Sequence, residues 1–104
     1  MTGFSRKLKG KEKRIKNINI SSEKIINQAF LLHTKGNIKE AAKYYQYLIN
    51  QGVQDHRVFS NYGLIQKGLG KLKEAELSIR KAIELNPNYA LGHSNLGGIL
   101  NSLG

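Results

Sequence analysis

At 104 residues with 39% apolar content, the chain has room for one small domain with a modest hydrophobic core. It has no cysteine, which excludes disulfides and thiolate metal sites, and no apolar run approaches the roughly eighteen residues of a membrane span. The first twenty residues lack the apolar core of a secretory signal, so we expect a cytoplasmic location. The net charge of +10 would suit binding to nucleic acid or an anionic membrane. Whether it indicates such a partner depends on how the charge is distributed along the chain.

Much of this positive charge lies at the N-terminus. Seven Lys and Arg residues against the single Glu12 give residues 1–20 a net charge of +6. Low apolar content and self-repulsion predict that residues 1–21 form a basic leader that is disordered or only partly helical. Phe4 is its one aromatic residue, so it has no series of rings on which bases stack. The sequence therefore favours a solvated leader over a binder of nucleic acid or anionic membrane.

Helix starts and stops divide the rest of the chain, residues 22–104. Ser21 and Ser22 before Glu23 are typical of a helix N-terminus, because a serine side chain accepts from the first free amides. Glycines punctuate the apolar spacings of three and four that indicate helices, and Pro87 ends the last full helix. The expected helices cover residues 22–35 and 38–51, then two more within 57–88 separated by Gly68 and Gly70, and a last one in 90–104.

A shift of 34 residues superimposes the chain on itself. Asn27 falls on Asn61 and Asn95, and Gly36 falls on Gly70 and Gly104. The units are residues 22–55, 56–89 and a shortened 90–104. This pattern predicts an all-α fold of antiparallel helix hairpins with about five helices, which make two full repeats plus the first helix of a third.

The repeat resembles the tetratricopeptide repeat family. The residues that carry the resemblance are Tyr62-Gly63, Gly70, Ala75, Ala82 and Pro87 in the middle unit, Ala29, Gly36, Ala41 and Tyr45 before it, and Leu96-Gly97 and Gly104 after it. The first unit departs from the pattern at Gln28 and at Gly52-Val53. The resemblance implies a right-handed superhelix of stacked hairpins, whose concave surface is lined by the first helix of each pair.

The three register-matched asparagines are the leading candidates for a binding site. An asparagine amide offers donors and an acceptor together, so a row of them suits the backbone of an extended peptide. The row resembles the asparagine ladder in the repeats of O-linked N-acetylglucosamine transferases. The predicted peptide groove comprises Asn27, Asn61, Asn95, Phe30, Arg57, Leu64 and Lys67, flanked by Glu23, Ile26, His33, Ser60, Leu91, Ser94 and Gly98.

Three functions remain open at this point. The leading hypothesis is a non-catalytic module that binds a protein, as a peptide or partner helix, in this groove. The second is the N-terminal recognition arm of a longer enzyme such as a glycosyltransferase, by analogy alone. The third is a leader-driven binder of nucleic acid or anionic membrane. We expect no catalytic residues, no cofactor and no metal site, because the three histidines are scattered without carboxylates at ligand spacing.

The shortened third unit presents an apolar helix without charge. Its sequence, ALGHSNLGGILNSLG, would leave apolar side chains without a covering second helix. It therefore predicts that this face pairs with a partner or with another copy in a homo-oligomer, or that the chain is an interrupted piece of a longer array. The expected self-association face comprises Leu96, Ile99, Leu100 and Leu103.

Overall fold

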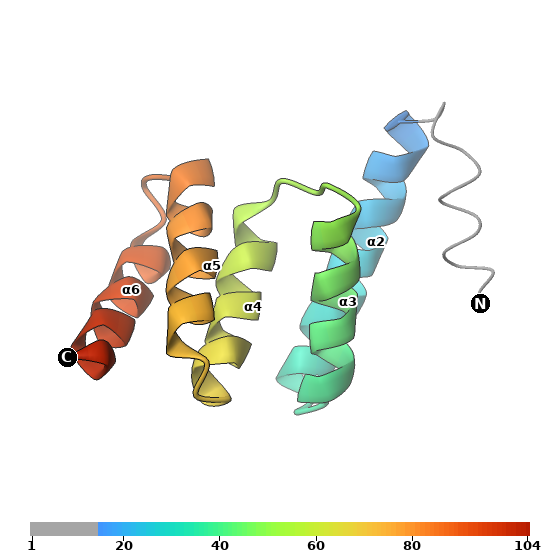
Figure 1. Ribbon diagram of the computed structural model, residues 1–104. Helices are drawn as coiled ribbons and strands as arrows, with labels where there is room; N and C mark the ends of the chain where they lie inside the picture. The colour runs from blue at the N-terminus through green and yellow to red at the C-terminus, as the bar shows by residue number, and fades with distance from the viewer. Residues whose placement is uncertain (1–14) are drawn as a thin grey trace.

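The computed structural model describes residues 15–104, with side chains from residue 22 onward. Its ordered elements are all α-helices, and the described residues contain no strand (Figure 1). The helices are α2 Ile15–Thr34, α3 Ile38–Asn50, α4 His56–Gly68, α5 Leu72–Leu85 and α6 Ala90–Leu103. The predicted all-α helical repeat fold is confirmed, with two helix pairs and the first helix of a third pair. No described helix is long and apolar enough to cross a membrane.

The turns within the two pairs have the same geometry. Gly36 and Gly70 adopt φ values of +85° and +82°, a left-handed conformation that glycine reaches without steric cost. In the first turn the Asn37 amide donates to the Leu32 carbonyl at 2.9 Å and the Gly36 amide to the His33 carbonyl at 3.0 Å. These two bonds make a Schellman motif, which satisfies the last carbonyls of α2. The register-matched glycines therefore mark equivalent helix ends, as the sequence predicts.

The first helix begins earlier than the serine signal predicts. The expected start at Ser22 is wrong, because α2 runs without a break from Ile15. Apolar residues at Ile15, Ile18 and Ile25 continue the helical spacing, and neither glycine nor proline interrupts it. Serine inside a helix costs only a few tenths of a kcal/mol relative to a good helix former, so it does not force a start. The rest of the basic leader, residues 1–14, which is expected to be disordered or only partly helical, lies outside the described residues.

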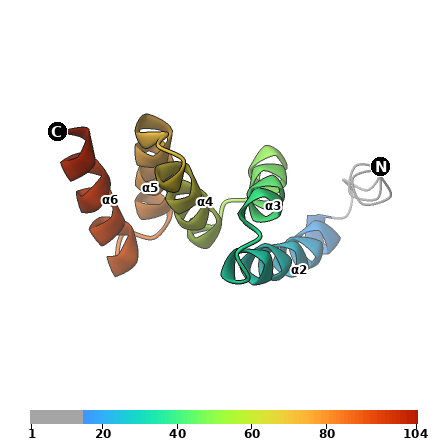
Figure 2. The same cartoon turned by 90° about the horizontal axis from the view of Figure 1, so that it is seen from below.

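The helices alternate between two rows. Figure 2 shows α2 and α4 in one row and α3 and α5 in the other. Each first helix packs against the second helix of its own pair and against that of the pair before it, so α4 contacts both α5 and α3. The exposure of one repeat position shows the effect of this stacking. Ile65 is 5% exposed and Ile99 is 0% exposed, whereas the equivalent Leu31 is 47% exposed. No helix of the described chain lies against that side of α2.

The core is divided in two. One cluster of buried residues joins α2, α3 and α4 around Tyr45, Leu48 and Val58. A smaller cluster joins α5 and α6 through Ile79 and Ile99. Stability in such an array comes from contacts between neighbouring helices and not from one central core. The first helices of the units, α2, α4 and α6, are therefore held in place by their packing against α3 and α5.

Candidate functional site

The three predicted asparagines lie one on each first helix. Asn27 belongs to α2, Asn61 to α4 and Asn95 to α6. Asn27 is exposed, and Asn61 and Asn95 are half-buried. We call the set of first-helix residues that the sequence predicts to line the groove the first-helix face: Asn27, Asn61, Asn95, Phe30, Arg57, Leu64 and Lys67. None of these seven side chains is fully buried, so each presents some surface to solvent.

Asn61 also contributes to packing between the first two units. Its side chain hydrogen-bonds the hydroxyl of Tyr45 on α3, whose ring is fully buried. Burial raises the pKa of Tyr45 to about 12, and the bond from Asn61 lowers that pKa in part. The same hydroxyl lies 3.3 Å from Nδ1 of His33, whose pKa is lowered by burial. Asn61 is therefore shared between the first-helix face and the α3–α4 interface, which the sequence pattern did not reveal.

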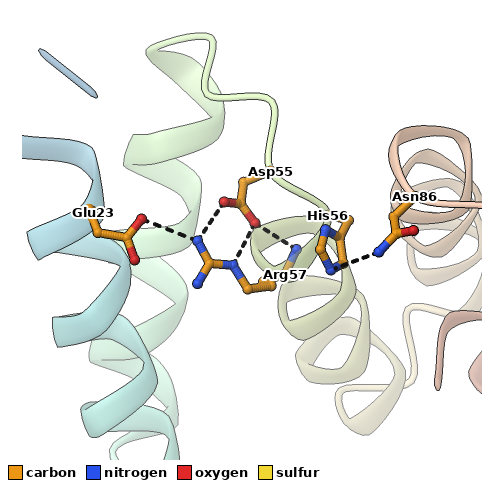
Figure 3. Close-up of polar contacts among 5 residues, drawn as sticks. All are labelled: Glu23, Asp55, His56, Arg57 and Asn86. Carbon is orange, nitrogen blue, oxygen red and sulfur yellow. Dashed lines mark hydrogen bonds and ion pairs between the residues drawn. The ribbon is translucent and has the colours of Figure 1, made fainter. Parts of the chain in front are cut away.

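Arg57 links the first two units through two carboxylates (Figure 3). Its Nη2 donates to Asp55 Oδ2 at 2.7 Å and to Glu23 Oε1 at 3.3 Å, and its Nε donates to Asp55 Oδ1 at 2.9 Å. The guanidinium also lies 5.6 Å from the ring centroid of Phe30, within the range of a cation–π contact. Arg57 thus joins α4 to α2 across 34 residues of sequence.

Asp55 supports this arrangement from the start of α4. It is the N-cap residue, and its Oδ1 accepts from the Arg57 backbone amide at 2.9 Å. The Arg57 side chain is the main cause that lowers the pKa of the Asp55 carboxyl, and burial opposes it. Asp55 and Glu23 in turn raise the pKa of Arg57. Two carboxylates compensate the Arg57 charge, so Arg57 shapes this face and is poorly placed to capture a further anion.

A second polar contact lies on the other side of the same turn of α4. Asn86 Nδ2 donates to His56 Nε2 at 3.3 Å (Figure 3). The rings of His56 and Tyr89 form a T-shaped pair with centroids 4.6 Å apart. These contacts fasten the α5–α6 connection to the start of α4. His93 on α6 is exposed and donates from Nε2 to the Pro87 carbonyl at 2.7 Å. Each of the three histidines therefore makes a hydrogen bond that stabilises the local structure.

Two flanking residues do not reach the surface. Ile26 is 2% exposed and Ser60 is 1% exposed, so the expectation that they flank an open groove is wrong. They occupy one register position on α2 and α4, and their helix neighbours cover them. The equivalent Ser94 on α6 is exposed, since no described helix follows it. Lys67 reaches from α4 to α6, because a Cβ placed on Gly98 would lie 3.3 Å from its Nζ.

The expected self-association face is only partly available. Ile99 is fully buried and Leu96 is partly buried, both packed within the α5–α6 cluster, so neither is free to meet another molecule. Leu100 and Leu103 are exposed at 40% and 38%, and Leu91 on the same helix is 61% exposed. The third unit consists of α6 alone, and the side of α6 that carries Leu96 and Ile99 is already packed against α5. Its available apolar surface is therefore smaller than the sequence indicates.

The pairing of charges between units was not predicted from the sequence. Glu23 and Arg57 occupy the same register position in adjacent units and carry opposite charges. In a stacked array such positions are neighbours, so this pairing was available as a signal. Asp55 had no such signal, because it lies in the connection before α4. The described residues contain no group of three or more His, Cys, Asp or Glu side chains placed to hold a metal ion.

Comparison with known proteins assigns the middle unit. No curated protein matches the chain. Residues 56–89, which form the pair α4–α5 and the following connection, match the family model described as tetratricopeptide repeat. Those bounds coincide with the middle unit found from the 34-residue shift. The match shows a tetratricopeptide repeat in the middle unit, and this repeat supports, in general terms, a protein–protein interaction module.

Proposed function

We propose that the chain is a non-catalytic module that binds a partner protein, as an extended peptide or a helix, along the first-helix face. The observation that carries the proposal is the register match of Asn27, Asn61 and Asn95 on the first helices of consecutive units. Amides repeated at one register position suit a peptide backbone, whose donors and acceptors also repeat. Leu64 and Phe30 add apolar contact area beside the row, and Lys67 adds one positive charge.

Asn27 and Asn95 are the cleaner probes of this proposal, because Asn61 also bonds Tyr45. A library of twelve-residue random peptides displayed on phage, selected on the immobilised protein, supplies a probe. Fluorescence anisotropy then compares the enriched peptide on the wild-type chain and on the variant with Asn27→Ala and Asn95→Ala. Losing two hydrogen bonds of roughly 0.5–1.5 kcal/mol each lowers the affinity by at least about fivefold.

Asn88→Ala provides the matched control, because Asn88 is exposed in the connection before α6. It should bind the enriched peptide as the wild type does. Equal affinities for the double variant and the wild type would overturn the assignment of this face.

The asparagine row also underlies the alternative of a recognition arm in a longer enzyme. In that case the same face would bind a protein substrate and present it to a catalytic domain. Both alternatives place binding on the first helices, so the experiment above applies to either.

A further inference from the structure

A second surface suited to binding lies on α3, in the row opposite the first-helix face (Figure 2). A trough of about 520 Å³ runs along α3 and is closed on one side by Tyr62 of α4. Three of its lining residues, Lys39, Lys43 and Tyr47, follow one another at intervals of four along the helix. Residues spaced in this way lie one above the other on a single helix face. The trough therefore presents two ammonium groups and an aromatic ring in a line.

The charge of this trough is one-sided. Its lining includes Lys39 and Lys43 and no carboxylate. Glu40 lies beside it, 3.7 Å from Lys43, but both side chains are more than half exposed, so this pair is weak and easily exchanged. An acidic ligand would meet two cations without displacing a buried ion pair.

The floor of the trough is apolar, and its polar edge is organised. Ala42, Tyr47 and Tyr62 are partly buried and pack against the larger core cluster. The Tyr62 hydroxyl donates to Gln46 Oε1, and Gln46 Nε2 donates to Asn50 Oδ1 at 3.3 Å. These bonds hold the amides along the edge that faces α4. Because Ala42 has a small side chain, it leaves open the part of the trough that a larger side chain at this position would fill.

The spacing of the three aligned residues matches an extended peptide. Along α3 the positions of Lys39, Lys43 and Tyr47 are separated by about 6 Å each, at 1.5 Å per residue. Alternate side chains on one face of an extended strand are separated by about 6.6 Å, at roughly 3.3 Å per residue. A peptide whose first and third residues are acidic and whose fifth is aromatic or apolar would align all three with the helix.

We propose that the α3 trough is a second binding site, which takes an extended acidic peptide segment of the form acidic-x-acidic-x-aromatic. The acidic side chains pair with Lys39 and Lys43, and the aromatic one packs over Tyr47 and Tyr62. On α5 the positions equivalent to the lining residues Ala42 and Asn50 carry Glu76 and Glu84, so the site without carboxylates belongs to the first unit alone. It is independent of the first-helix face.

The test uses three five-residue peptides, of which the first two have the same composition and the third replaces Glu by Gln. Tetramethylrhodamine-labelled Glu-Ala-Glu-Ala-Phe amide is titrated with the full chain and followed by fluorescence anisotropy. Glu-Glu-Ala-Ala-Phe amide has the same charge with the acids out of phase, and it should bind at least threefold more weakly. Gln-Ala-Gln-Ala-Phe amide lacks the charges and should bind at least tenfold more weakly.

Charge-reversal variants locate the site. Lys39→Glu combined with Lys43→Glu should lower the affinity for the in-phase peptide at least tenfold. Lys71→Glu combined with Lys73→Glu changes the net charge equally at exposed positions outside the trough and should alter it less than twofold. Circular dichroism confirms that both variants remain helical, which exposed substitutions should allow.

Three results would overturn the proposal. The first is equal binding of the in-phase and out-of-phase peptides, which would indicate attraction by net charge alone. The second is an equal loss of affinity in both charge-reversal variants, and the third is full displacement of the peptide by a ten-nucleotide oligothymidylate at matched charge. Any of the three would mean that the two lysines belong to a surface that attracts polyanions in general.

Discussion

At the scale of single residues, the joint between the first two units depends on charges that sequence spacing only partly reveals. Arg57 and Glu23 share a register position, but their partner Asp55 lies in a connection that the repeat pattern does not constrain. Asp55 caps α4 through its side chain and holds the Arg57 guanidinium at the same time. A single side chain thereby fixes both the start of a helix and the orientation of a residue on the first-helix face.

Replacing Asp55 by alanine should destabilise the chain by about 1–2 kcal/mol, because α4 loses its cap and Arg57 loses its closest partner. Urea unfolding followed by circular dichroism at pH 7 measures the difference. Asp55→Ser retains an oxygen that accepts from the Arg57 amide, so it should recover part of the loss. If serine behaved as alanine does, the cap would not be the source of the effect.

The same carboxyl gives the measurement a pH dependence. Its folded-state pKa is lowered, so its stabilising contribution is present above the unfolded pKa near 3.8 and is lost as the pH falls through the folded value. The stability difference between the wild type and Asp55→Asn should therefore be constant from pH 7 to about pH 5 and shrink below pH 4. A difference that grew on acidification would contradict the assigned sign.

At the scale of helices, equivalent positions in the repeat have different surroundings. Gly63 on α4 is buried, and a Cβ added there would lie 2.7 Å from Cδ1 and 2.9 Å from Cγ1 of Ile79, which is itself fully buried. Gly97 occupies the same position on α6, and an added Cβ would meet nothing within 4 Å. The two glycines are equivalent in the repeat pattern, but only Gly63 has a neighbouring side chain that an added Cβ would contact.

Alanine at these two positions should therefore have opposite effects. Gly63→Ala forces Ile79 to move in a packed interior and should cost about 1–3 kcal/mol. Gly97→Ala replaces a helical glycine in open space and should stabilise the chain by up to about 1 kcal/mol. Thermal unfolding of the two variants beside the wild type decides the matter. A destabilised Gly97→Ala variant would mean that α6 has a neighbour on that side in solution.

The sequence predicted the helices and their turns well because these depend on local chemistry. Gly36 and Gly70 end their helices in a left-handed conformation that glycine adopts without steric cost, so the positions of these glycines are enough to locate the two turns. The start of α2 was missed because a serine favours a helix N-terminus but does not enforce one. The burial of Ile26, Ser60 and Ile99 was missed because it depends on which helices lie across from them.

At the scale of the whole molecule, the two ends of the stack differ from its middle. The first cluster, around Tyr45, gathers side chains from three helices, and the second, around Ile79 and Ile99, gathers them from two. Leu31 on α2 is exposed where its equivalents in later units are buried, and Leu100 and Leu103 are exposed on α6. The repeated sequence is regular, whereas each unit's surroundings depend on its place in the stack.

The exposed leucines of α6 lead us to expect weak self-association. Multi-angle light scattering between about 10 and 500 µM should show a mass that rises with concentration. Leu100→Lys combined with Leu103→Lys should abolish the rise, because charge on the shared surface opposes contact between copies. Lys71→Ala, away from α6, should leave it unchanged. A strict monomer over the whole range would count against this surface.

The central claim is that partners bind along the first helices. Hydrogen–deuterium exchange of the full chain, with and without the phage-selected peptide, tests it most directly. We expect added protection of amides in α2, α4 and α6, centred on the helical turns that carry Asn27, Asn61 and Asn95, with little change in α3 and α5. Protection confined to α3 and α5 would contradict the claim.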